Sequence, residues 1–162
     1  NRIALMVEHI VSGRNLGNCF VPKRRLRKKF HGEWHETSEK LFPGYVFVIT
    51  EQPQTLYEEV KKIPALTKLL GRNGEYFTPL SKADVQTIEK LQNKAEEGWG
   101  VETEISKIAV GEGKRVKILS GPLQNLEGQV RKINLHKRIA EVEIDFMGSK
   151  TVIYLGIEPA FR

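Results

Sequence analysis

The chain has 162 residues, with 26 lysines and arginines against 20 aspartates and glutamates. Its formal net charge is therefore +6 and its pI is near 9.4. A composition with 40% hydrophobic and 28% charged residues excludes an intrinsically disordered or fibrous chain. The single cysteine, Cys19, excludes an internal disulfide framework and a zinc site built from several cysteines.

The apolar runs of the chain are short. The run Val46–Ile49 behind Tyr45 is far below the ~20 residues that a membrane-spanning helix needs, and the start of the chain has no signal-peptide pattern. We therefore expect a soluble, cytoplasmic protein without membrane contact, in one domain or two small ones. A pI above ~9 is one mark of nucleic-acid binding, but a mild basic surplus also serves solubility alone. The net charge alone does not decide between nucleic-acid binding and solubility.

The basic residues are not spread evenly along the chain. Two local clusters fit phosphate contact better than a uniform solubility charge does. The first is dense and contains Lys23, Arg24, Arg25, Arg27, Lys28 and Lys29. The second is looser and contains Arg131, Lys132, His136, Lys137 and Arg138, with Lys150 as a further candidate.

Helices and strands alternate in the first part of the chain. Apolar residues at helical spacing predict an amphipathic helix over 3–11. A short strand follows at 19–21, and the basic and aromatic stretch 24–36 around His31-Gly32 predicts a protruding hairpin or loop. The run 45–49 predicts a strand that is buried on both faces.

Two further helices are predicted by their start signals. Pro53 fits the first position of a helix. Ser81 and Asp84 form an S-x-x-D capping box before the apolar positions of a third helix. The segment 93–104 has acidic residues and glycines with little apolar periodicity, which is typical of a linker.

Beyond the linker, the apolar period changes to two. Alternation around Val116 and Ile118, along 140–146 and again at Val152 and Tyr154 predicts short strands with glycine-rich turns. Such a pattern within ~60 residues indicates a small β-barrel. The predicted fold class is therefore α+β, with interleaved helices and strands followed by a small all-β barrel.

Tests for catalytic or metal-binding motifs give no case for an enzyme or a cofactor. His31 and His35 have the wrong order for a H-E-x-x-H site, and Gly32 between them argues against a helix. The sequence of residues 111–114 lacks the first glycine and the Ser/Thr of a phosphate-binding loop, so a turn at a strand entry is favoured. Cys19 lies beside apolar residues and is interpreted as a core residue.

Two ordered sets of motifs resemble a known family. Cys19–Pro22, Leu41–Val48, Ile63–Gly71 and Pro79–Ser81 resemble the N-terminal (NGN) domain of the bacterial NusG transcription elongation factors. The segments 110–116, 120–123, Gly128 and 133–146 are similar to the KOW motif of the same family. Within the family, the basic hairpin, Leu69-Leu70-Gly71 and the Lys137-Arg138 pair are most similar to LoaP, a specialised antiterminator paralogue.

The resemblance implies an NGN domain at 1–94, in which helices flank an antiparallel sheet, a linker at 95–104 and a small SH3-like KOW β-barrel at 105–162. The sequence departs from the family pattern in two places. The family opens with a Trp-Tyr strand, and this chain begins within the helix that follows it. Asn125 replaces a glycine of the KOW turn, and we expect it to adopt the left-handed conformation that asparagine tolerates.

The resemblance also implies the partners. The NGN domain is expected to bind RNA polymerase through Phe42, Pro43 and Tyr45, with the Phe42 ring partly exposed at a strand entry. For Tyr45, a place in the core is an equally good interpretation. We expect Phe42→Ala to leave the domain folded and to weaken polymerase binding.

The two basic clusters are the expected nucleic-acid contacts. The resemblance places the first, with Phe30, Trp34 and His35, near the upstream fork and the non-template DNA strand. A solvated charged loop is its alternative. The resemblance to LoaP implies that the KOW domain binds a hairpin in the nascent leader RNA. Because Glu141, Glu143 and Asp145 on the barrel strand would repel phosphate, the KOW cluster is the expected contact.

The resemblance leaves three functions open, all for a monomer. The first is a processive antitermination factor. The second is a housekeeping NusG that couples polymerase to a ribosomal protein or a termination factor, through the apolar strand around Phe146. The third is a static RNA-binding KOW protein, against which the NGN block argues.

Overall fold

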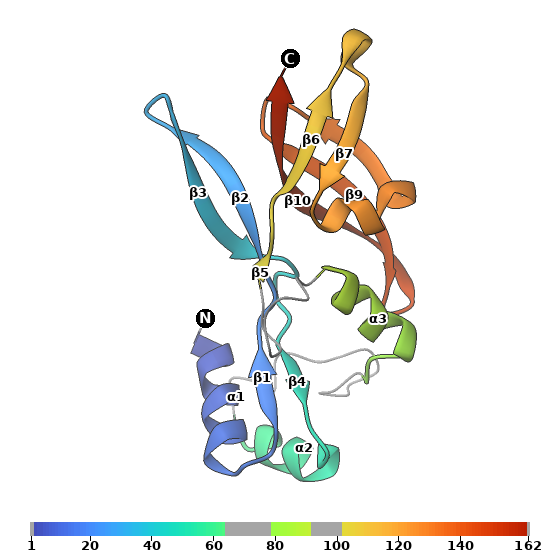
Figure 1. The fold of residues 1–162 in the computed structure, drawn as a ribbon. Helices are drawn as coiled ribbons and strands as arrows, with labels where there is room; N and C mark the ends of the chain where they lie inside the picture. The colour runs from blue at the N-terminus through green and yellow to red at the C-terminus, as the bar shows by residue number, and fades with distance from the viewer. Residues whose placement is uncertain (1, 64–78, 92–101, 162) are drawn as a thin grey trace. The chain divides into compact units, whose positions relative to one another are not determined.

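The computed structural model describes residues 2–63, 79–91 and 102–161 (Figure 1). By its contacts the chain divides into two compact units. The first unit contains residues 1–21 and 44–80, and the second contains residues 22–43 and 81–162. The α+β fold class is confirmed, whereas the domain boundaries at 94 and 105 stay a prediction.

The first unit is two helices packed with a small antiparallel sheet. Helix α1 (Arg2–Gly13) and helix α2 (Pro53–Lys61) accompany strands β1 (Asn18–Phe20) and β4 (Phe47–Ile49). The predicted amphipathic character of α1 is confirmed, because its apolar side meets that of α2 in one core. The buried members of this core are Val7, Val11, Leu16, Leu56, Val60 and Ile63.

The sheet of the first unit is shorter than the sequence predicts. Among the described residues, strand β4 pairs with β1 alone, in a register that aligns Cys19 with Val48 and ends at the Phe20–Phe47 pair. Tyr45, two residues before that end, has a half-exposed side chain. The expectation of a strand over 45–49 buried on both faces is therefore wrong, because β1 offers only three residues for pairing.

A long two-stranded hairpin opens the second unit. Strand β2 (Lys23–Phe30) pairs antiparallel with strand β3 (Glu33–Lys40) along its whole length. His31 and Gly32 connect them with φ angles of 49° and 82°, the left-handed pair that a tight two-residue hairpin turn requires. The predicted hairpin is confirmed, and its turn lies at the free end of the two strands in Figure 1.

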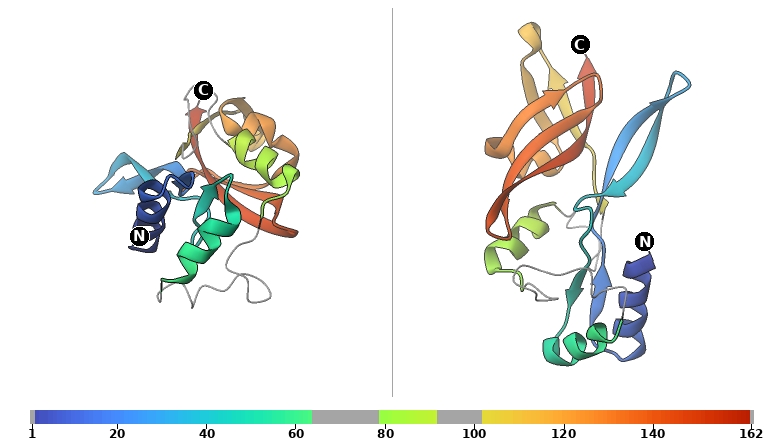
Figure 2. Two further views of the ribbon diagram at one scale, coloured as in Figure 1. Left: turned by 90° about the horizontal axis from the view of Figure 1, so that it is seen from below. Right: turned by 180° about the vertical axis from the view of Figure 1, so that it is seen from behind.

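A five-stranded sheet forms the rest of the second unit, in the order β7-β6-β10-β9-β8. Its strands are β6 (Ser106–Val110), β7 (Val116–Ser120), β8 (Val130–Asn134), β9 (Ile139–Phe146) and β10 (Ser149–Phe161). The sheet curls on itself, as Figures 1 and 2 show. The predicted small β-barrel of alternating strands is thus confirmed, with the even positions 140–146 of β9 buried.

Short 3-10 turns connect the barrel strands. Turn η3 (Glu112–Lys114) leads into β7, as expected of a turn at a strand entry, and turns η4 (Pro122–Asn125) and η5 (Glu127–Gln129) lead into β8. The buried Ser106 hydroxyl accepts a hydrogen bond from the Leu123 N–H. Asn125 ends η4 and is not among the residues with positive φ. The expected left-handed asparagine is therefore wrong, because a 3-10 turn needs right-handed backbone there.

Strand β10 changes its neighbour at Gly156. Residues 149–156 pair antiparallel with β9, and residues 157–161 pair parallel with β6. A Cβ atom at Gly156 would lie 2.4 Å from the Arg25 carbonyl oxygen of the hairpin. The backbones of β10 and β2 are therefore in direct contact at this position.

Part of the predicted linker forms a strand. Strand β5 (Glu102–Thr103) pairs parallel with Lys23 and Arg24 of β2. Residues 92–101 of the linker lie outside the described residues. The end of the predicted linker is therefore the third strand of the sheet that contains the hairpin, next to β2.

Helix α3 (Lys82–Leu91) is fixed at its start by one carboxylate. Asp84 accepts a hydrogen bond from the Ser81 N–H through Oδ2 at 3.3 Å, and the Ser81 hydroxyl accepts from the Asp84 N–H at 3.1 Å. The predicted capping box is confirmed. The other oxygen, Oδ1, accepts the Met147 N–H of the β9–β10 turn at 3.0 Å, so Asp84 also joins α3 to the barrel.

We expect Asp84→Ala to lower the free energy of unfolding by roughly 1–3 kcal/mol, because it leaves the Met147 N–H without its acceptor as well as removing the cap. Ser81→Ala removes only a capping bond and should cost about 1 kcal/mol. Urea denaturation followed by circular dichroism measures both. Equal losses for the two variants would show that the bond to Met147 contributes nothing.

Candidate nucleic-acid interface

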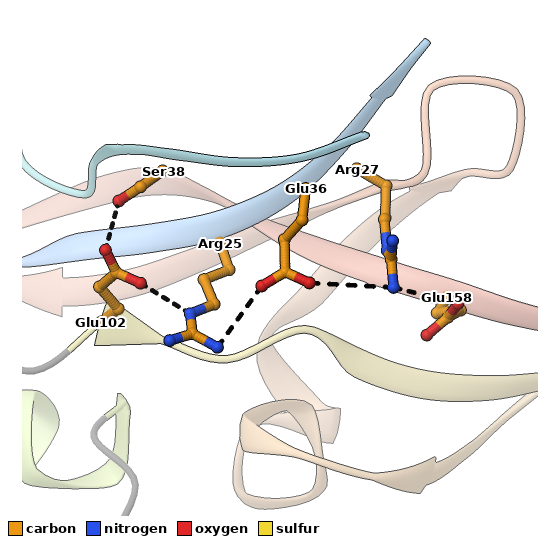
Figure 3. Close-up of polar contacts among 6 residues, drawn as sticks. All are labelled: Arg25, Arg27, Glu36, Ser38, Glu102 and Glu158. Carbon is orange, nitrogen blue, oxygen red and sulfur yellow. Dashed lines mark hydrogen bonds and ion pairs between the residues drawn. The ribbon is translucent and has the colours of Figure 1, made fainter. Parts of the chain in front are cut away.

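The cations on one face of the hairpin are held by carboxylates from three other strands. Arg25 Nε donates to Glu102 Oε2 at 2.6 Å, and its Nη1 lies 3.4 Å from Glu36 Oε1 (Figure 3). Arg27 Nη2 lies 3.8 Å from the other oxygen of Glu36 and 3.6 Å from Glu158 of β10. The ladder alternates cation and carboxylate, so β3, β5 and β10 all neutralise charge on β2.

The opposite face of the hairpin has its own carboxylate. Glu39 accepts from Arg24 Nη2 at 3.4 Å and forms a close ion pair with Lys28. The Arg24 guanidinium also lies over the Tyr154 ring of β10, 5.7 Å from its centroid. Leu26 between these two cations is buried. Four of the six predicted hairpin cations are thus paired within the protein.

The paired carboxyl groups are more acidic than free ones. The hydrogen bond from Lys28, followed by that from Arg24, lowers the pKa of Glu39 below its ordinary value of 4.5. The bonds from Arg25 and Ser38 lower the pKa of Glu102 in the same way. The Glu102 contact raises the pKa of Arg25 in turn. Each shift favours the charged form of both partners.

Of the six predicted hairpin cations, Lys23 at the base of β2 and Lys29 at the hairpin tip form no ion pair with the described residues. Within the described part of the chain, Lys29 has no carboxylate at ion-pair distance, and it lies opposite Trp34 in the β2–β3 register. Phe30 is 49% exposed, and its ring centroid lies 5.9 Å from that of His35. The tip therefore carries an unpaired cation beside aromatic rings.

The predicted cations of the barrel also include some that are paired with a carboxylate and some that are not. Arg131 lies 3.6 Å from Glu143, and Lys150 lies 3.7 Å from Glu143 and 3.5 Å from Asp145. Lys132 is exposed on β8 and has no such partner among the described residues. The acidic face of β9 is therefore expected to repel phosphate less than the sequence suggests. Two of the predicted RNA contacts, Arg131 and Lys150, already neutralise part of its charge.

The β8–β9 turn presents the remaining predicted cations. His136 and Lys137 are exposed in it, and the Lys137 N–H donates to Asn134 Oδ1 at 2.9 Å. Arg138 has a left-handed φ of 53°, and its guanidinium carbon lies 3.9 Å from the centroid of the Trp34 ring. The two predicted clusters therefore meet, through one stacked pair of side chains.

The three expected polymerase contacts lie in different surroundings. Phe42 is 4% exposed and stacks on Phe146 at 4.7 Å between ring centroids, so the expectation of a partly exposed ring is wrong. The reason is that the chain entering residue 43 packs on the end of β9. Pro43 is exposed, and Tyr45 is 50% exposed, 6.3 Å from the Phe47 ring.

Family models match both parts of this arrangement. The model "Transcription termination factor nusG" matches residues 3–89, more than half of the chain, and the KOW motif matches residues 112–145. The chain belongs to the NusG family. The NusG match contains the hairpin and Phe42, and the KOW match contains β7, β8, the β8–β9 turn and most of β9.

Curated relatives with the name "Transcription termination/antitermination protein NusG" cover most of the chain. The Helicobacter pylori (strain 26695) protein is 28% identical over 72% of this chain and 62% of its own length. The Thermus thermophilus protein is 29% identical over 81% and 72%, and the Bacillus subtilis protein is 26% identical over 83% and 73%. The chain spans just under two thirds of the length of the two Helicobacter pylori relatives.

Several residues of this NusG-family surface were not predicted from the sequence. Glu36, Glu39, Glu102 and Glu158 hold the hairpin cations, and Tyr154 lies beside Arg24. The only local signal was the presence of Glu36 and Glu39 in β3, which the hairpin register places opposite Arg27 and Arg24. Glu102 and Glu158 are distant in the chain and gave no signal.

A reactive thiol and a metal site each have requirements that the described part of the chain does not meet. Burial, with a contribution from Glu8, raises the pKa of the Cys19 thiol to about 11, which keeps it protonated and unreactive. Among the described residues no three His, Cys, Asp or Glu side chains are grouped as a metal site. Of the helices described, none has the length and apolar character to cross a membrane.

The hairpin ion pairs predict how the stability depends on pH. Glu39 and Glu102 have lower pKa values in the folded chain, so their pairs stabilise it fully above the ordinary pKa of 4.5. This contribution is lost as the pH falls through the folded-state pKa values. We expect Glu39→Gln and Glu102→Gln to lower the free energy of unfolding at neutral pH and to match the unchanged chain in acid.

Urea denaturation at neutral and acidic pH measures this difference. Glu89→Gln on α3 is the matched control, because Glu89 is exposed and has no ion pair among the described residues. A Glu39→Gln difference that persisted in acid would contradict the assignment.

Proposed function

We propose that this chain is a NusG-type transcription elongation and processive antitermination factor. In this proposal it binds RNA polymerase through the NusG-matched region and a leader RNA hairpin through the KOW-matched barrel. The single observation that carries the proposal is the order of the two family matches, with the exposed cations of the β8–β9 turn inside the second. LoaP-type antitermination is the most specific form of this proposed function.

The RNA contact is assigned chiefly to the barrel cations that lack a carboxylate. Lys132, His136 and Lys137 are exposed, so phosphate binding costs them no internal ion pair. Arg131 and Lys150 would have to share or leave Glu143, which makes them secondary. Three cations on phosphates give a slope of log K against log salt of about −2 with the single-strand coefficient.

The nucleic-acid contact of the hairpin is assigned to its tip. Arg24, Arg25, Arg27 and Lys28 stabilise the hairpin through their carboxylate partners. Lys29 remains for phosphate, and Phe30 for an unpaired base. Lys23 at the base of β2 is exposed and is kept as a secondary contact.

We assign the polymerase contact to Pro43 and Tyr45. Phe42 is assigned to the packing of the fold and not to direct contact with polymerase. The exposed Tyr45 ring has the size and amphipathic character of an interface anchor. The Phe42 ring is buried on Phe146, so we expect Phe42→Ala to destabilise the fold by ~3–5 kcal/mol rather than to leave it intact. Phe42 is therefore a poor probe of polymerase binding.

One observation favours a second function, coupling to a protein partner through the barrel. Val152 and Tyr154 on β10 are 42% and 43% exposed and point to the same side of the strand. The partner site expected around Phe146 is less suitable, because Phe42 covers that ring. A ribosomal protein or a termination factor is the partner class that this alternative requires.

We expect Lys137→Glu to weaken RNA-hairpin binding by about tenfold, and the Lys137→Glu/Arg138→Glu pair to abolish it, because both reverse charge in the exposed turn. Filter binding of a structured leader RNA and a scrambled RNA across a salt series measures this. Lys117→Glu is the control, since Lys117 is exposed on β7 at the other edge of the sheet order. Retained hairpin affinity in the double variant, or equal affinity for both RNAs, would overturn the RNA proposal.

We expect Tyr45→Ala to weaken RNA polymerase binding roughly tenfold while the fold and RNA binding stay unchanged, because the ring is an exposed candidate anchor. Polymerase pull-down and interferometry measure the affinity. Tyr154→Ala, a similarly exposed tyrosine on the barrel, is the matched control. An unchanged affinity of a folded Tyr45→Ala chain would contradict the placement.

A further inference from the structure

One stacked pair of side chains joins the hairpin, near its tip, to the β8–β9 turn of the barrel. The Arg138 guanidinium lies over the Trp34 ring at 3.9 Å, within the second compact unit. The β8–β9 turn that carries Arg138 is itself held, because the Arg138 carbonyl oxygen accepts the Ile157 N–H at 3.0 Å. Trp34 is paired with Lys29 across the hairpin. The stack therefore connects two ordered backbone segments.

The charges around this stack are positive. Lys29 and Lys137 are both exposed and have no carboxylate at ion-pair distance in the described residues. The nearest acidic residues along the hairpin face and β10, Glu36 and Glu158, are already bound to Arg25 and Arg27. This leaves a local surplus of cations that the protein does not use internally.

The carboxylate at the tip does not cancel that surplus. Glu33 is highly exposed, and its Oε2 lies 3.9 Å from His35 Nε2. Its side chain therefore extends into solvent beside the His35 imidazole. Glu33 lies with His35 and its cross-strand partner Phe30 on the side of the hairpin opposite Trp34 and Lys29.

Aromatic rings accompany these cations. Phe30 is 49% exposed beside His35 at the end of β2, a position with no structural demand for an apolar ring. Exposed rings next to cations fit unpaired bases, because a base offers a π-face and a phosphate together. An acidic protein surface would use the cations but would leave the exposed Phe30 ring without a role.

We propose that the hairpin tip and the β8–β9 turn form one RNA-binding surface, the tip–turn surface, made of Lys29, Trp34, Lys137 and Arg138 on one face, together with Phe30 on the other face of the tip. It binds a single RNA strand that leaves the stem-loop held by the barrel. Lys29, Lys137 and Arg138 contact phosphates, Trp34 holds the Arg138 guanidinium in place, and Phe30 stacks on an unpaired base. The inference rests on the proposed RNA binding and adds the hairpin tip to it.

The experiment uses the full chain and an RNA stem-loop that it enriches from a random library. Three fluorescein-labelled forms of this RNA are compared by anisotropy: with a single-stranded extension, blunt, and with the extension made of DNA. We expect Lys29→Glu and Phe30→Ala each to weaken binding of the extended RNA roughly tenfold. The same two variants should leave the blunt stem-loop affinity unchanged.

Two controls separate a binding role from a structural one. Lys117→Glu on β7 reverses an exposed charge far from the tip in the sheet order and should change no affinity. Arg138→Lys keeps the charge but loses the planar stack on Trp34, so it should weaken only the extended RNA. Circular dichroism spectra that match the unchanged chain establish that each variant is folded.

The fluorescence of Trp34 gives an independent readout. The chain has two tryptophans, so a Trp99→Phe variant leaves Trp34 as the single reporter beside the proposed site. Its emission should change with the extended RNA at the same concentrations as the anisotropy, and not with the blunt stem-loop.

The outcomes distinguish this inference from the function on which it rests. Failure to enrich any RNA would overturn the proposed RNA binding itself. Enriched RNA that depends on Lys137 but not on Lys29 or Phe30 would leave that function standing and overturn the tip–turn surface. Equal binding of the DNA-extended form would overturn the assignment of the surface to RNA.

Discussion

The neutralisation of the β2 cations is the constraint on which the second unit depends. Six lysines and arginines on one eight-residue strand repel one another, and the strand is tolerated because carboxylates from other strands alternate with them. Glu36 and Glu39 come from β3, Glu102 from β5 and Glu158 from β10. Each exposed pair is worth little alone, but together they bring β5 and the barrel strand to the hairpin.

This neutralisation also decides where charge remains for a partner. The net charge of +6 does not measure the nucleic-acid surface, because most hairpin cations are used inside the protein. The hairpin tip and the β8–β9 turn keep exposed cations, because Lys29 and Lys137 have no carboxylate at ion-pair distance among the described residues. The proposed interface is therefore smaller than the basic clusters of the sequence, and it combines them.

The sequence predicted the elements because their signals are local. Helical spacing, the Ser81–Asp84 capping box and the period-two strands each act within a few residues, and all are present in the structure. The pairing between elements could not be predicted, since Arg25 and Glu102 are 77 positions apart and nothing local marks them as partners. The burial of Phe42 escaped for the same reason, because its stacking partner Phe146 lies in the other family motif.

Gly156 gives the second unit an uneven tolerance to sequence change. Its missing side chain lets β10 touch the Arg25 carbonyl of β2, at the residue where β10 exchanges β9 for β6. The ion pairs around it are exposed and replaceable, whereas backbone contact admits no larger residue at any charge. Surface charges on hairpin and barrel are thus free to diverge as binding targets change, while position 156 keeps the two parts in register for whatever they bind.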